Sequence, residues 1–154
     1  MCLSSGKEEE ANAITQNLIR NNHENTELIE KTKKIYSDAG KSDAGDELIN
    51  KTKTEIVDLN NKGAHLLKEG KLEESIELFM KAARGMPDNI IVNLNAAYSL
   101  MMQMQKTGKV KKYSSRVESY LERVHTLDPS NKKYHELTDM LRRLINEKNK
   151  AKAA

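Results

Sequence analysis

The chain has 154 residues, of which 32% are charged and 4% aromatic, and its formal net charge at pH 7 is +3. This composition supports stacked helix pairs better than one large core, and no stretch alternates apolar and polar residues as strands do. We therefore expect an all-α fold. The charge is below the basic excess of most nucleic-acid-binding proteins, but it excludes little on its own.

Export and membrane insertion are not expected. Cys2 is the only cysteine, so an internal disulfide is impossible and the chain suits a reducing cytoplasm. No apolar run approaches the roughly 18 residues of a membrane span, and residues 1–20 lack a basic start followed by an apolar core. The sequence predicts a cytoplasmic protein with no membrane contact.

The first two predicted helices cover residues 7–21 and 25–38. They lie between Gly6 and Gly40, whose separation equals the length of the helical unit found further along the chain. The opening M-C-L-S-S-G is interpreted as the tail of a helix whose body is missing. On this interpretation helix 7–21 lacks its partner, and residues 1–154 form one helical domain at the C-terminal end of a longer protein.

A single long helix is predicted over residues 42–69, because no proline or turn cluster interrupts it and Leu48, Thr52 and Ile56 keep helical spacing. It would end one helical unit and begin the next. Gly70 then turns the chain into a helix over residues 71–85, and Pro87 cannot continue that helix.

The most regular helical unit runs from Ile56 to Asn89. Small residues stand where two antiparallel helices must approach closely, and larger apolar residues fill the gaps around them. These residues are Leu59, Gly63, Leu66, Ser75, Phe79, Ala82 and Pro87. The length and pattern resemble the tetratricopeptide repeat, a helix–turn–helix unit of about 34 residues, which implies a right-handed α-α superhelix of antiparallel helix pairs. Lys62 departs from the pattern, which has an apolar residue before the glycine.

Three further helices are predicted over residues 89–106, 110–127 and 131–148. The first two are expected to be an elongated pair. The spacing from Gly108 to Pro129 is four residues longer than that from Gly70 to Pro87, and four residues make about one helical turn. A longer loop at residues 105–112 is the alternative. The last helix carries the apolar stripe Tyr134, Leu137, Leu141, Leu144 and Ile145 and is expected to cap the stack.

The order of the segments resembles the C-terminal region of bacterial two-component response regulators that join a receiver domain to tetratricopeptide repeats. The matching segments are G-K-E-E-E-A, G-D-E-L-I-N-K-T-K-T-E-I-V-D-L-N-N-K-G, E-G-K-L-E-E-S-I-E-L-F, N-L-N-A-A and Y-L-E-R-V-H-T-L-D-P. The resemblance implies an output or adaptor role, with the receiver domain upstream.

Catalysis is not expected from the residues present. His23, His65, His125 and His135 are dispersed, and the lone cysteine cannot complete a zinc site. No phosphate-binding loop, nucleophile elbow or paired-carboxylate cleft is recognisable. We predict a non-catalytic scaffold for protein–protein interaction, with no cofactor and no metal.

The partner is expected in a groove, because the first helices of such repeats line a concave surface. The predicted groove residues are Val57, Asn60, Asn61, Ala64, Leu67, Lys68, Ile91, Leu94, Asn95, Tyr98, Met101 and Met102. Asn61 and Asn95 are one repeat length apart, and their carboxamides could hold the backbone of an extended peptide. Hydration of both is the alternative. The two methionines and Tyr98 could equally fill the core between helices.

Two other functions stay open. In the first, helix 7–21 or the last helix docks on a second copy and forms a homodimer. In the second, a basic segment binds nucleic acid, although such charge runs are usually solvated helix faces. Its residues are Lys106, Lys109, Lys111, Lys112 and Arg116, with Arg142 and Arg143.

Overall fold

A computed structural model of the chain describes residues 8–22 and 25–153, and these residues form seven α-helices and no strand. The expectation of an all-α fold is confirmed. The helices are α1 Glu8–Asn22, α2 Thr26–Asp38, α3 Ser42–Lys68, α4 Leu72–Gly85, α5 Ile90–Thr107, α6 Val110–Leu127 and α7 Lys132–Ala153. The interpretation of residues 1–6 as the tail of a helix, and His23, lie outside the described residues.

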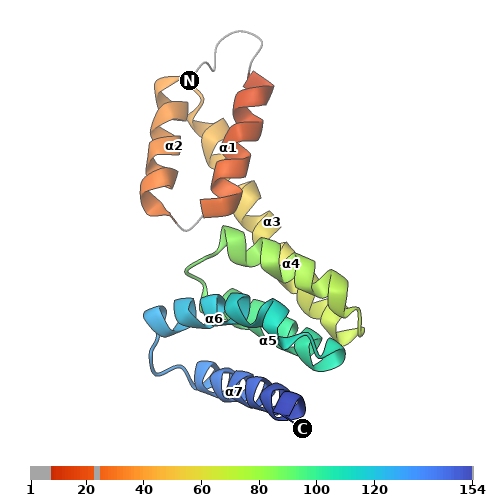
Figure 1. The fold of residues 1–154 in the computed structure, drawn as a ribbon. Helices are drawn as coiled ribbons and strands as arrows, with labels where there is room; N and C mark the ends of the chain where they lie inside the picture. The colour runs from red at the N-terminus through yellow and green to blue at the C-terminus, as the bar shows by residue number, and fades with distance from the viewer. Residues whose placement is uncertain (1–7, 23–24, 154) are drawn as a thin grey trace.

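The helices form two groups that share α3 (Figure 1). α1, α2 and the first half of α3 lie at one end, and the second half of α3 stacks with α4, α5, α6 and α7 at the other. Asn25 and Asn89 begin α2 and α5 by accepting hydrogen bonds from the Leu28 and Val92 amides. Gly70 and Gly108 adopt φ values of 79° and 66°, which few residues other than glycine tolerate.

One continuous helix, α3, supplies apolar residues to two cores. Ile49 packs with Ile19 and Ile29 in a small cluster, whereas Ile56 belongs to the main core with Phe79. The predicted long helix over residues 42–69 corresponds to α3, which ends at Lys68. Its two halves therefore serve separate groups of helices, as expected.

Helices α3 and α4 meet closely at Gly63. A Cβ atom on this glycine would lie 3.0 Å from Cδ1 and Cε1 of Phe79. On α4, Ser75 and Ala82 are fully buried. Lys62, which departs from the repeat pattern, is exposed, so its charge stays hydrated.

The long loop considered at residues 105–112 is wrong, because only Gly108 and Lys109 separate α5 from α6. Both helices have 18 residues and form the elongated pair. α7 packs against α5 and α6 through the buried Leu137 and Leu141, as expected of a last helix that covers the stack.

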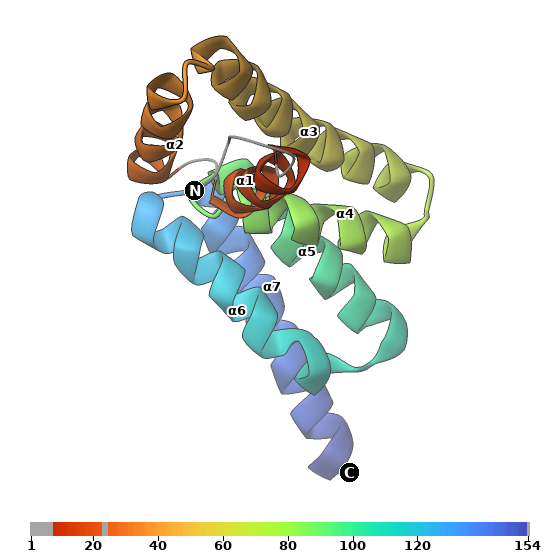
Figure 2. The ribbon, with the colours of Figure 1, turned by 90° about the horizontal axis from the view of Figure 1, so that it is seen from above.

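Helix α1 is covered by other helices of this chain, while the expectation that its own repeat partner lies upstream stays a prediction. α1 packs against α3 and α4 and lies beside both in Figure 2. Its inner face buries Ala11, Thr15 and Ile19. The physical reason is that the long α3 reaches past α4 and offers α1 a surface within the same chain. The outer face of α1 still exposes Ile14 and Leu18.

Candidate partner-binding surface of α3 and α5

Two of the predicted groove residues, Asn60 on α3 and Asn95 on α5, link the two helices. Nδ2 of Asn95 donates a hydrogen bond to Oδ1 of Asn60, at 3.1 Å, and so joins the two helices. Val57 precedes Asn60 by three residues and Ile91 precedes Asn95 by four, so each apolar residue lies one turn away on the same face. We call Val57, Asn60, Asn61, Ala64, Ile91, Asn95 and Tyr98 the α3–α5 surface.

The apolar side chains of this surface are unusually accessible. Val57 is 44% exposed and Ile91 is 65% exposed. The two are also one repeat length apart, so they occupy equivalent places on the two helices. A pair of exposed branched side chains beside paired carboxamides offers both apolar contact and hydrogen bonding to a ligand.

The carboxamide pair differs from the expected one. Asn60, and not Asn61, faces Asn95, whereas Asn61 is exposed one position further round the helix. The bond uses one hydrogen of the Asn95 amide and one lone pair of the Asn60 carbonyl. The Asn60 amide and the Asn95 carbonyl keep the capacity to bond a partner.

The remaining predicted residues divide between surface and core. Ala64, Leu67, Leu94 and Tyr98 are partly buried and pack against the main core. Lys68 is exposed and Met102 is half-buried.

Met101 is wrongly assigned to the groove, because it is fully buried in the main core. The physical reason is that α4, α6 and α7 all pack against α5, which leaves only a narrow strip of this helix accessible. The alternative that this methionine fills the space between helices is correct.

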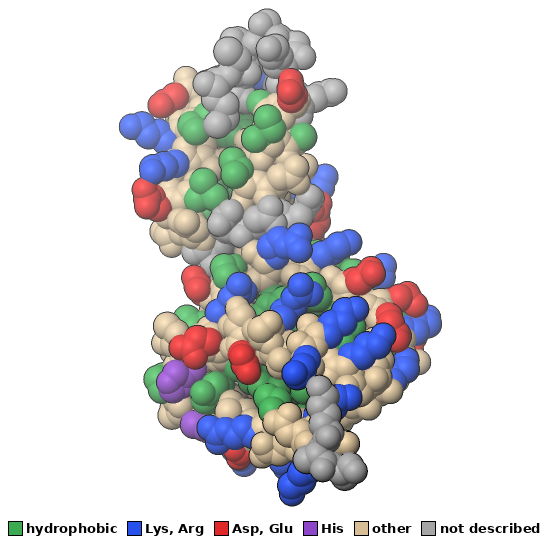
Figure 3. All heavy atoms as spheres, in the orientation of Figure 1, with side chains coloured by type: hydrophobic (Ala, Val, Ile, Leu, Met, Phe, Trp, Pro, Cys, Tyr) green, Lys and Arg blue, Asp and Glu red, His purple; other side chains and the backbone are tan. Residues whose placement is uncertain are grey.

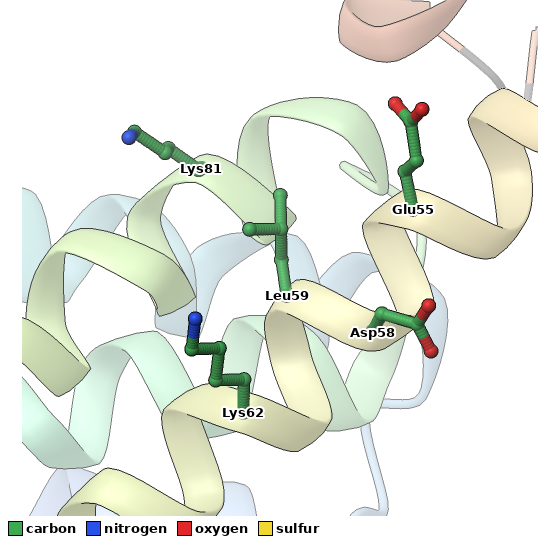
Figure 4. A pocket seen from close by; sticks show the side chains of 5 residues that line it. All are labelled: Glu55, Asp58, Leu59, Lys62 and Lys81. Atoms are coloured by element: carbon green, nitrogen blue, oxygen red, sulfur yellow. The ribbon is translucent and has the colours of Figure 1, made fainter.

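A hollow of about 490 Å³ between α3 and α4 was not predicted. In Figure 4, Leu59 points from α3 toward α4, with Glu55, Asp58 and Lys62 on α3 and Lys81 on α4 around it. The sequence signal was the spacing of Glu55, Leu59 and Lys62 along one helix face, which alone resembles an ordinary solvated face. The hollow also explains why a lysine is tolerated at position 62.

The basic segment considered for nucleic-acid binding is partly neutralised. Nζ of Lys106 lies 3.0 Å from Oε1 of Glu73, and this contact lowers the pKa of the Glu73 carboxyl. Arg142 lies 3.3 Å from Asp139. Lys109, Lys111 and Lys112 are exposed. The charges of this segment are therefore interrupted by carboxylates.

Across the described ranges, no group of three or more His, Cys, Asp or Glu residues is placed to hold a metal ion. None of the described helices combines the length and the apolar character needed to cross a membrane. Comparison of the chain with models of protein families, with curated proteins and with solved structures finds no match.

Proposed function

We propose that this chain is a non-catalytic scaffold of the tetratricopeptide-repeat type that binds a protein or peptide on the α3–α5 surface. The observation that carries the proposal is the exposure of Val57 and Ile91 at equivalent positions beside the bonded pair of Asn60 and Asn95. Exposed branched side chains cost free energy in water, so their pairing on one surface favours a binding role.

The chemistry of the surface favours an extended peptide. Apolar side chains of such a peptide would contact Val57 and Ile91, while its backbone amide and carbonyl groups would bond the two carboxamides between them. A carboxamide both donates and accepts hydrogen bonds, so the part of the binding made through the peptide backbone depends little on the side chains of the peptide.

The wider setting follows from the order of the sequence segments. That order resembles the repeat region of two-component response regulators, and it supports a role as the output or adaptor part of a cytoplasmic signalling protein. A scaffold with an accessible binding face suits this role, because an adaptor acts by holding a partner.

Peptides selected from a random displayed library against the whole chain provide the probe for a test. We expect Ile91→Asp to weaken binding of the selected peptides by at least about tenfold, which is about 1.4 kcal/mol, because it places a charge where apolar contact is made. Fluorescence anisotropy of labelled peptides measures the dissociation constants, and circular dichroism checks that helicity is unchanged.

Leu127→Asp is the matched control, because Leu127 is an apolar residue of α6 that is 41% exposed and lies outside the α3–α5 surface. The control is expected to bind like the parent chain. If both substitutions weaken peptide binding equally, or if neither weakens it, the selected peptides bind elsewhere on the chain.

Self-association is a second candidate function, favoured by α1. Ile14 is 52% exposed and Leu18 is 44% exposed, one helical turn apart on the outer face. If a second copy covers this stripe, sedimentation equilibrium should show a mass that rises with concentration, and Ile14→Ser with Leu18→Ser should return the chain to a monomer. A monomer at every concentration for the parent chain rules this candidate out.

A further inference from the structure

An arginine cluster occupies the face formed by α4 and α6, away from the α3–α5 surface. On α6, Arg116, Tyr120 and Arg123 are spaced by four and three residues and so share one face. Arg84 lies on α4, directly after Ala83, whose carbonyl oxygen contacts Arg123. Figure 3 shows several Lys and Arg side chains over this part of the molecule, with Asp and Glu side chains among them.

Arg123 is held in place by neutral groups. Its Nη1 donates to the Ala83 carbonyl oxygen at 3.5 Å and to Oδ1 of Asn93 at 3.4 Å, and its guanidinium lies 5.5 Å from the centre of the Tyr120 ring. Asn93 is itself fully buried and fixed by bonds to the Pro87 and Asn89 carbonyl oxygens. A guanidinium has five N–H donors, so most of those on Arg123 remain for a ligand.

The other two arginines converge on the same place. Nη1 of Arg116 lies 3.8 Å from Sδ of Met80, one turn before Arg84 on α4. Tyr120 is 8% exposed, and its burial raises the pKa of the phenol, while the charges of Arg116, Arg123 and Arg84 lower it. The guanidinium groups of Arg116 and Arg123 therefore contact one turn of α4, at Met80 and Ala83, and Arg84 follows Ala83 directly.

Within the described part of the chain, none of the three arginines forms an ion pair with a carboxylate. No described carboxylate oxygen lies within 4.0 Å of a guanidinium nitrogen of Arg84, Arg116 or Arg123. Carboxylates such as Glu77 on α4 and Glu118 on α6 are exposed on the same helices. A long polyanion would also meet these carboxylates, whereas one compact anion needs only the guanidinium groups.

We propose that Arg84, Arg116 and Arg123 bind a phosphate monoester dianion carried on a side chain of a partner protein. Guanidinium groups match phosphate oxygens with paired N–H donors, and arginine groups are a common recognition device for phosphorylated side chains. Arg84 and Arg116 are exposed, so a group on the surface of another protein reaches them without entering a cavity. Arg123 is already oriented, which reduces the entropy lost on binding.

Degenerate peptide pools with a fixed central phosphoserine or phosphotyrosine, and their unphosphorylated counterparts, are the probes for this site. We expect the whole chain to bind at least one phosphorylated pool about tenfold more tightly than its counterpart. Arg84→Gln with Arg116→Gln should abolish that difference. Both residues are exposed, so the double variant is expected to fold, and circular dichroism verifies this.

Arg142→Gln with Arg143→Gln on α7 removes the same charge outside the cluster, and we expect it to keep the preference for the phosphorylated pool. Loss of the preference in this control, or its absence in the parent chain, overturns the proposal, because the attraction would then be general or missing.

Competition experiments separate the possible anions. If inorganic phosphate displaces the labelled phosphopeptide at the same molar concentration as unlabelled phosphopeptide does, the site binds free phosphate, and the proposal of a partner protein is overturned. Duplex DNA that displaces the phosphopeptide at low concentration also overturns it, in favour of nucleic acid. None of these residues belongs to the α3–α5 surface, so this test and the Ile91→Asp test fail independently.

Discussion

Phe79→Ala is expected to lower the free energy of unfolding by about 3–5 kcal/mol, the range for a large core side chain reduced to a methyl group. Phe79 is 1% exposed and belongs to the main core, and its ring lies against Gly63, where α3 and α4 pack closely. The substitution opens a cavity at this contact, and the backbone of two helices limits how far the cavity can collapse. Urea unfolding followed by circular dichroism measures the loss.

Leu127→Ala gives the comparison for this measurement, because Leu127 is 41% exposed and its truncation should cost well under about 1 kcal/mol. Equal losses for the two variants would contradict the close packing of α3 on α4. The loss expected for Phe79→Ala is a large share of the roughly 5–15 kcal/mol that stabilises an ordinary domain. Partial unfolding of Phe79→Ala at room temperature is therefore a supporting result.

Gly45→Ala is expected to destabilise the fold by about 1–3 kcal/mol, although alanine normally stabilises a helix by about 1 kcal/mol over glycine. A Cβ atom at Gly45 would lie 2.6 Å from Cβ and 2.7 Å from Cγ of Tyr36 on α2. These atoms are close to the backbone and cannot move without moving α2. The Tyr36 hydroxyl also donates to Oδ1 of Asn12 on α1, so displacing the ring loosens a third helix.

Glu47→Ala tests the same stretch of α3 without a clash, because Glu47 is exposed, and we expect a change within about 0.5 kcal/mol. Thermal unfolding of both variants separates the two effects. An increase in stability for Gly45→Ala would mean that α2 and α3 are further apart than the structure has them, since only the helix propensity would then remain.

The helices were predictable because their boundaries depend on local chemistry. Gly40, Gly70 and Gly108 supply positive φ angles after three helices, and a proline two residues after α4 prevents its continuation. Bounds that depend on these signals differ from the expected ones by a residue at most, as at the end of α3 at Lys68. α7 has no such signal near its end and continues to Ala153, beyond the expected residue 148.

The packing of the helices and the details of the site were less predictable. The docking of α1 on both α3 and α4 depends on residues distant in sequence, which no local pattern encodes. Successive helical residues point about 100° apart, so a small error in the assigned face separates Asn60 from Asn61 and the buried Met101 from the half-buried Met102. The arginine cluster shows the same limit, because Arg116 and Arg123 share a visible spacing whereas the position of Arg84 depends on how α4 and α6 both pack on α5.

The uninterrupted course of α3 also constrains how the length of the chain can vary. Adding one residue between Ile49 and Ile56 would turn the two halves of α3 by about 100° relative to each other. α1 could then keep its packing against α3 or against α4, but not against both. Adding seven residues nearly restores the orientation but separates the halves by about 10.5 Å, so that α1 loses its contact with α4. The contacts of α1 with both α3 and α4 therefore require a fixed length of α3 and a fixed rotation between its two halves. Insertions are better tolerated at the turns around Gly40, Gly70 and Gly108.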